Sequence, residues 1–155
     1  MNSFVVDYCA RQKIGGTHID FFLAKQLPVP APSVLDWPAP WSSGESIADW
    51  MRSRVLELTY TAVDMAGFAA DLGYSGPPFA WNVERRRQLR AELDAACFHL
   101  YGLDREEAAY VMDTFHIVQR KDEAVFGEYL TKRMILEQFD VLAISSQSVG
   151  QLDER

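Results

Sequence analysis

The residues best suited to chemistry lie near the start of the chain, in a segment that joins basic side chains to two glycines and a Thr-His pair. Its basic side chains can neutralise phosphates, and its glycines would let the backbone approach a duplex closely. The Thr and His side chains can form hydrogen bonds to base edges. The candidates for DNA binding are therefore Arg11, Lys13, Gly15, Gly16, Thr17, His18 and Lys25.

The same segment also fits a structural interpretation. Lys and Arg stabilise the C-terminal end of a helix through its dipole, and glycine commonly follows such an end. In this view a capped helix simply turns into a strand. The chemistry of the residues alone leaves both interpretations open.

Further basic groups occur later in the chain, and each could meet a phosphate. Those near residue 86 have acidic neighbours within one or two helical turns, which would reduce their positive potential. Two of these neighbours, Glu92 and Asp94, are expected on a solvated helix surface. The secondary phosphate candidates are Arg85, Arg86, Arg87, Arg120, Lys121, Lys132 and Arg133.

No catalytic constellation is found in the sequence. There is no glycine-rich turn between a strand and a helix, no Gly-x-Ser-x-Gly elbow and no His-Glu-x-x-His pair. Cys97 and His99 are two residues apart, which places them on different faces of a helix, so Cys97 is expected to be a packed core residue. We therefore expect no enzymatic activity, no metal site and no cofactor in this chain.

Composition limits the class of protein. The 155 residues are 48% hydrophobic and carry a net charge of -7, which suits one domain and is unusual for a free-standing DNA-binding protein. Residues 1–27 carry three basic and two acidic groups, a net of +1, so the remainder is at -8. Any contact with DNA is thus expected to be local. With two cysteines, no apolar run long enough for a membrane span and no secretory signal, we expect a cytoplasmic location without membrane partners.

The pattern of apolar residues predicts a mainly α fold of about four to five helices. Helices are expected over residues 3–13, 46–72, 83–101, 104–113 and 122–143, with a polar break around Arg120 and Lys121. Alternation of Ile19, Phe21 and Leu23 predicts one short N-terminal strand or hairpin over 18–27. The proline-rich stretch 28–44 predicts an irregular strap pinned by its tryptophans and gives two regions, 1–44 and 45–155.

Several blocks of the sequence, in order, resemble one known family. The first block is NSFVVDYCARQKIGGTHIDFFLAKQLPVPAP, followed by RVLELTYTAVDMAGFAADLGYSGPPFAWNVERRRQLRAELDAACFHLYGL, YVMDTFHIVQRKDE and GEYLTKRMILE. They resemble the C-terminal part of single-chain restriction-modification N6-adenine DNA methyltransferases. Residues 1–44 then resemble the end of the target-recognition region, and 45–155 the helical extension that follows it. Two positions depart from the expected pattern, His116 in place of proline and Leu130 in place of arginine.

The resemblance implies a function in DNA modification without catalysis. The S-adenosylmethionine site and the Asn-Pro-Pro-Tyr type loop of the family are expected upstream of residue 1, so this chain is not expected to methylate DNA alone. The leading hypothesis is a non-catalytic C-terminal fragment that contributes DNA target recognition or assembly. Its expected partners are double-stranded DNA, bound weakly by the chain alone, and a methyltransferase or restriction polypeptide in cis or in trans.

The rival hypothesis is a free helical subunit for protein–protein interaction without DNA contact. Its apolar surfaces, including Trp37, Trp41 and Trp81, would dock on another chain or on a second copy. An enzymatic function is the third alternative, and no group of residues supports it.

Overall fold

The computed structural model describes residues 3–15 and 18–150, with side chains as far as Ser145. This part of the chain is mainly helical, as predicted, and contains no strand. The elements are α1 (Phe4–Lys13), α2 (Phe21–Ala24), the 3-10 helix η1 (Pro32–Asp36), α3 (Ile47–Thr59), the 3-10 helix η2 (Val63–Met65), α4 (Ala66–Asp71), α5 (Val83–Leu100), α6 (Arg105–Asp113), α7 (His116–Phe126) and α8 (Leu130–Gly150).

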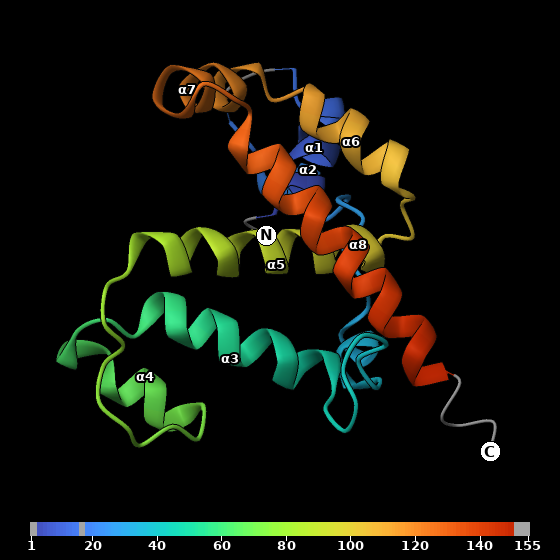
Figure 1. Ribbon diagram of the computed structural model, residues 1–155. Helices are drawn as coiled ribbons and strands as arrows, with labels where there is room; N and C mark the ends of the chain where they lie inside the picture. The colour runs from blue at the N-terminus through green and yellow to red at the C-terminus, as the bar shows by residue number, and fades with distance from the viewer. Residues whose placement is uncertain (1–2, 16–17, 151–155) are drawn as a thin grey trace.

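Helix α5 lies at the centre of the molecule. It packs against α1, against α3, and most extensively against α8, which crosses it obliquely (Figure 1). Its alanines and Phe98 allow this close approach, since Ala95, Ala96 and Phe98 are completely buried. The main core also includes Val5 of α1 and Trp41, so residues on both sides of position 44 contribute to one hydrophobic cluster.

A second, smaller cluster lies at the far end of α3. Leu56, Tyr60 and Ala69 are buried there, and Tyr74 packs edge-on against Tyr60 with 6.0 Å between ring centroids. This cluster explains why the helix predicted over 46–72 is interrupted. The chain leaves α3 at Tyr60, whose carbonyl accepts a hydrogen bond from Phe79 N–H at 2.9 Å, and η2 and α4 then fold back as separate short helices.

The predicted helix starts are confirmed where a side chain caps the helix locally. Ser46 accepts a hydrogen bond from Asp49 N–H at 3.1 Å, and Asn82 accepts one from Arg85 N–H at 2.9 Å. Asp104 forms the full reciprocal capping box of α6. These caps satisfy N–H groups that have no partner within the helix, so they fix where α3, α5 and α6 begin.

The strand predicted for residues 18–27 is wrong. Asp20 accepts a hydrogen bond from Leu23 N–H at 2.9 Å and starts the four-residue helix α2. A strand needs a neighbouring strand to pair with, and none lies in the described ranges 3–15 and 18–150. The local cap therefore determines the conformation.

The helix predicted over 122–143 is also wrong, because two helices occupy this part of the chain. Arg120 and Lys121 do not interrupt a helix but lie within α7. The break comes at Gly127, which ends α7 with φ of 75°, a left-handed conformation that glycine adopts without strain. Asp122 then accepts a hydrogen bond from Thr131 N–H at 2.6 Å, which supports the first turn of α8.

The irregular strap predicted for residues 28–44 is not supported either. The five residues Pro32–Asp36 form η1, and Pro38 pairs with Ser46 in an isolated bridge. Only one of its tryptophans holds the segment to the core, since Trp41 is 7% exposed while Trp37 is 59% exposed. Proline fixes φ but still permits a 3-10 turn that starts with it.

Candidate binding surfaces

The basic candidates in α1 are held against the protein itself. The Arg11 guanidinium donates two hydrogen bonds to the Asp7 carboxylate, at 3.0 and 2.9 Å, and lies 4.6 Å above the Phe115 ring centroid. The hydrogen bond with Asp7 raises the pKa of Arg11. A phosphate would therefore have to compete with Asp7 for this side chain.

The other candidates of the N-terminal segment lie in and around a loop. Lys13 Nζ donates a hydrogen bond to the Gln26 carbonyl at 2.8 Å, which joins the two ends of the loop. The Lys25 ammonium lies 4.3 Å above the Phe21 ring, His18 is exposed, and Gly15 has open space around its Cα. Gly16 and Thr17 lie outside the described residues.

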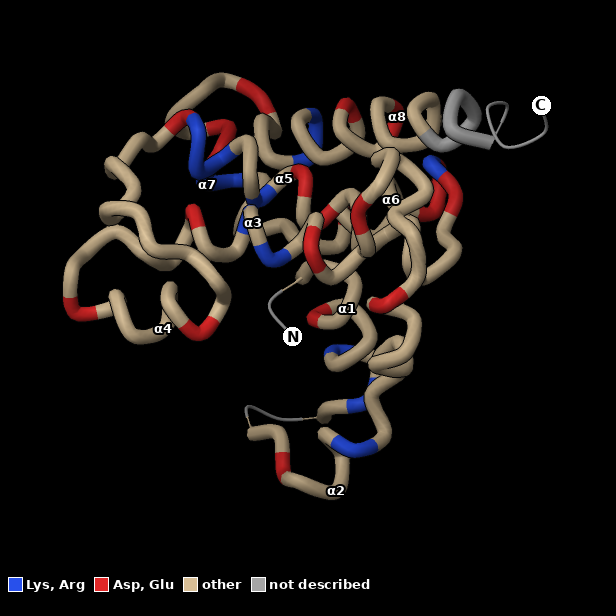
Figure 2. Tube along the Cα trace, turned by 90° about the horizontal axis from the view of Figure 1, so that it is seen from below, with Lys and Arg blue, Asp and Glu red and all other residues tan. Residues whose placement is uncertain are grey.

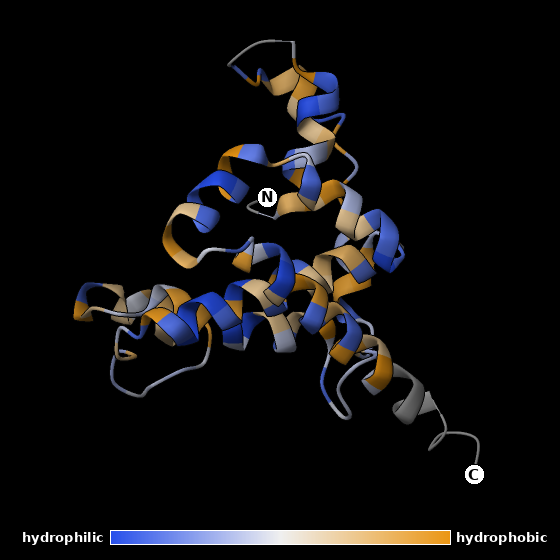
Figure 3. Ribbon diagram, turned by 45° about the horizontal axis from the view of Figure 1, so that its top comes forward, coloured by the Kyte–Doolittle hydropathy of each residue, from blue (hydrophilic) through white to orange (hydrophobic). Residues whose placement is uncertain are grey.

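Residues 18–27, which we call the projecting segment, extend away from the helical body (Figures 2 and 3). Basic residues lie at the base of the segment in Figure 2, and strongly hydrophobic residues occur on it in Figure 3. Ile19, Phe21 and Phe22 are 52, 75 and 72% exposed, and α2 buries none of its residues. The sequence pattern does not reveal this exposed apolar tip, because alternating apolar residues are typical of a half-buried strand.

Most of the secondary phosphate candidates are engaged within the molecule. Arg85 forms a bidentate pair with Glu57, and Arg87 pairs with Glu84 at 2.6 Å. Arg86 donates to the Leu58 carbonyl at 2.7 Å and lies over the Trp81 ring. Towards the C-terminus, Lys132 pairs with Asp113, and Arg133 pairs with Glu128 and Glu137.

Arg120 and Lys121 differ from these groups. Both are exposed on α7, and within the described part of the chain neither has a carboxylate within 4.0 Å. The seven secondary candidates are distributed over three helices, α5, α7 and α8.

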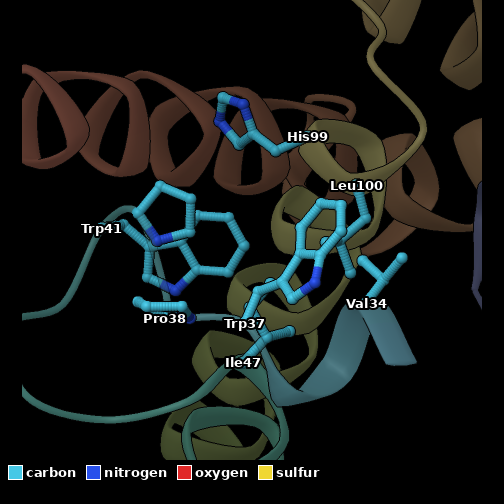
Figure 4. Close-up of a pocket in the computed structure, with 8 residues that line it drawn as sticks. Val34, Trp37, Pro38, Trp41, Ile47, His99 and Leu100 are labelled. Carbon is cyan, nitrogen blue, oxygen red and sulfur yellow. The ribbon is translucent and has the colours of Figure 1, made fainter. Parts of the chain in front are cut away.

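A small pocket lies between η1, the residues that follow it and the end of α5 (Figure 4). Its cavity volume is about 300 Å³, and the indoles of Trp37 and Trp41 border it together with Ile47 and His99. The Nε1 atom of Trp41 is buried without a hydrogen-bond partner. His99 stacks on Phe139 with 3.9 Å between ring centroids, and its Nε2 lies 2.9 Å from the Phe139 carbonyl, so this imidazole has a structural contact to α8.

A much larger groove follows α5. It has a cavity volume of about 1110 Å³ and is lined mainly by apolar side chains of α1, α3, α5, α7 and α8, with Arg86, Arg87 and Arg90 near one end. Sequence patterning could not reveal it, because its walls come from helices that are far apart along the chain.

Asp94 and Cys97 lie in this groove, and burial changes the chemistry of both. The Asp94 carboxylate accepts a hydrogen bond from Phe4 N–H at 2.9 Å and so caps α1 from a neighbouring helix. Burial raises the pKa of Asp94 to about 6, and burial together with the charge of Asp94 raises the pKa of the Cys97 thiol to about 11. A thiol with so high a pKa is a weak nucleophile at neutral pH, which fits the predicted packing role of Cys97.

Glu92 is the second acidic residue whose solvated position was wrongly predicted. It is 9% exposed and accepts a hydrogen bond from Arg54 Nε at 2.7 Å. Glu92 therefore faces α3 and Asp94 faces the start of α1.

Comparison with known proteins gives no match to a family model, a curated protein or a solved structure. The resemblance to adenine methyltransferases therefore stays a prediction. Within the described ranges, no helix is both long and apolar enough to span a bilayer. In the same ranges, no three His, Cys, Asp or Glu side chains come together as a set of metal ligands.

Proposed function

We propose that this chain is a non-catalytic module that sits on a methyltransferase or restriction-type polypeptide, in cis or in trans. The docking element is the projecting segment, and the observation that supports it is the exposure of Ile19, Phe21 and Phe22. Large aromatic side chains that are rigid and exposed on a protrusion are typical anchors of protein interfaces. Exposing them costs free energy in water, and a partner pocket would recover it.

The charge around these anchors indicates what kind of pocket would receive them. Lys25 lies on the Phe21 ring, while Lys13 and Arg11 lie towards the base of the loop. An apolar pocket with acidic residues at its rim would therefore complement this segment. A protein partner is favoured over DNA because Arg11 and Lys13 already have acceptors and the rest of the chain is acidic.

Contact with duplex DNA is the second candidate function. It is supported by His18 and Lys25, which are exposed on the segment with the net charge of +1. In an assembled complex these two side chains would reach the duplex beside the partner, so that phosphate contacts add to an existing interface.

The test uses a recombinant adenine methyltransferase polypeptide of the resembled family that lacks its own C-terminal region. The chain is labelled, and its binding is measured by fluorescence anisotropy. Phe21→Ala with Phe22→Ala is expected to weaken binding at least about tenfold, since two aromatic anchors are lost. The matched control is Ile117→Ala with Val125→Ala, which removes exposed apolar side chains of α7 and should leave binding unchanged.

Two outcomes would contradict the proposal. If the Phe21→Ala, Phe22→Ala variant binds as tightly as the unmodified chain, the projecting segment is not the docking element. If the unmodified chain binds duplex DNA but not the polypeptide, DNA recognition becomes the leading function. Transfer of methyl groups by the chain alone, with S-adenosylmethionine supplied, would refute its non-catalytic role.

A further inference from the structure

One stripe of α5 forms the floor of the large groove. Arg86, Arg90, Leu93, Cys97 and Leu100 line it at spacings of three and four residues, the spacing of one helix face. The last three are only partly buried, although they lie on the central helix of the fold. A helix that packs against another normally buries such a stripe completely, whereas these three side chains stay partly buried, and α1 reaches this face with its N-terminal end, at Asp94.

The dimensions of the groove suit a helix. From position 86 to position 100 the floor extends roughly 21 Å, at 1.5 Å per residue, which corresponds to about four helical turns. One wall comes from Val55 and Leu58 of α3, and the opposite wall from Phe126 of α7 and Met134 of α8. Apolar groups on both sides would contact the flanks of an inserted apolar stripe.

Positive charge is concentrated at the start of this floor. Arg90 is exposed and has no carboxylate within 4.0 Å among the residues that the structure describes. Arg86 has a neutral carbonyl and an indole as partners, and the carboxylate that pairs with Arg87 belongs to Glu84, whose side chain is 79% exposed. These contacts leave net positive charge at one end of a groove in a chain whose net charge is -7.

The groove is lined by three arginines and by two acidic residues that have partners of their own. Asp94 and Asp122 each accept a hydrogen bond from a backbone N–H, of Phe4 and Thr131 respectively. Asp94 interacts with the charge of Arg90, and because its pKa is raised to about 6, this offset weakens as the pH falls below 7. A partner that carries carboxylates at one end and apolar side chains along its length would therefore complement the groove in both charge and polarity.

We infer that the groove receives an amphipathic helix of a partner polypeptide, with its apolar stripe on α5 and its acidic end at Arg86, Arg87 and Arg90. This binding site is separate from the projecting segment, which contributes no residue to the groove. The inference does not depend on the proposed function.

The probes are two synthetic helical peptides of about 16 residues, or four turns, that share one leucine stripe. One ends in three glutamates and the other in three lysines, and each carries a fluorophore for anisotropy with the full chain. The glutamate peptide is expected to bind at least about tenfold more tightly than the lysine peptide. Arg86→Gln with Arg90→Gln should remove this difference. The matched control, Arg120→Gln with Lys121→Gln, removes two positive charges of α7 outside the groove and should preserve it.

A second pair of variants tests the apolar wall. Val55→Asp places a charge in the α3 wall at a side chain that is 38% exposed, and should abolish binding of the glutamate peptide. The control Val141→Asp, at a 50% exposed position of α8 outside the groove, should leave binding of the glutamate peptide unchanged. Circular dichroism checks that each variant folds. If Val55→Asp does not fold, the comparison of the glutamate peptide with the lysine peptide still tests the inference on the unmodified chain.

The inference is overturned if neither peptide binds, or if the lysine peptide binds as tightly as the glutamate peptide. Dodecanoate serves as a third probe, and its binding in the absence of peptide binding would assign the groove to small anionic amphiphiles. The Phe21→Ala, Phe22→Ala variant should bind the glutamate peptide normally, so failure of the docking proposal and failure of this inference can be distinguished.

Discussion

Asp94 shows how one side chain can stabilise a contact and carry a cost at the same time. Its carboxylate caps α1 through Phe4 N–H, yet burial raises its pKa to about 6. An acid whose pKa is higher in the folded state than in the unfolded state favours folding below the unfolded value, and this contribution is lost as the pH rises through the folded value. The contribution of Asp94 to the free energy of unfolding should therefore fall as the pH rises from about 4 to about 7.

The variant Asp94→Asn keeps an oxygen for Phe4 N–H and cannot ionise. We expect the two proteins to be similarly stable near pH 4, whereas at pH 7 the variant should be more stable by up to about 3 kcal/mol. Urea unfolding of both proteins over this pH range measures the difference between their free energies of unfolding. The contributions of the other titrating groups are common to both proteins and cancel in this difference. A difference that does not change with pH would show that Asp94 is not the source.

At the scale of single residues, the sequence predicts what local chemistry determines. Ser46, Asn82 and Asp104 start helices because their oxygens bond to N–H groups three residues ahead. The roles of Glu92 and Asp94 were not predictable in this way, since their partners lie 38 and 90 residues away along the chain. The exposed aromatic tip lies between these two cases. Asp20 is a local capping residue that favours a helix, but the alternation of apolar residues around it favours a strand.

At the scale of elements, α3 and α5 are joined by a partly buried ion pair. Arg54 Nε donates to Glu92 at 2.7 Å, while the Arg54 guanidinium lies 3.5 Å above the Trp50 ring and Gln88 donates to the other Glu92 oxygen. Without Arg54, the buried Glu92 carboxylate would keep only the Gln88 amide at 3.2 Å and the Arg85 guanidinium at 3.8 Å, and would lose its shortest contact with a positive charge. This pair therefore holds the two helices in register more strongly than a surface pair would.

Arg54→Ala is expected to reduce the free energy of unfolding by about 3 kcal/mol. Arg105→Ala, which breaks the exposed pair with Asp140, should cost less than about 1 kcal/mol. Replacing both Arg54 and Glu92 by leucine should recover much of the loss, because no charge is then left unpaired. Equal effects of the two alanine variants in chemical denaturation would contradict this distinction.

The elements themselves were predicted well where one amphipathic stripe ends at a clear signal. α1, α5 and α6 match their predicted ranges within a residue or so, and α5 has both Asn82 and Gly102 at its ends. The predictions failed where tertiary contacts divide a continuous apolar pattern, as at Tyr60, or where Gly127 was overlooked inside such a pattern. Propensity cannot locate these breaks, because the packing of distant segments determines them.

At the scale of the whole molecule, the negative charge opposes binding to nucleic acid. We expect the isolated chain to bind a short duplex only weakly at low salt, with affinity that falls steeply between 50 and 200 mM salt, at about one unit of log-log slope per phosphate contact. Arg11→Ala with Lys13→Ala should lower this slope if those side chains reach phosphates. Anisotropy with labelled DNA measures both quantities. Tight binding that is insensitive to salt would refute the view that charge limits the contact.

The hydrogen bond from Lys13 to the Gln26 carbonyl has a consequence for how this protein can change over evolutionary time. It closes the base of a loop whose outer part contributes nothing to the core, and Tyr101 secures the chain just beyond it by donating to the Pro28 carbonyl at 2.5 Å. Substitutions in residues 18–24 should therefore change the free energy of unfolding very little, so selection for a stable fold constrains them only weakly. The sequence of this loop can therefore change, and with it the partner that the loop binds, while the helical core keeps its structure.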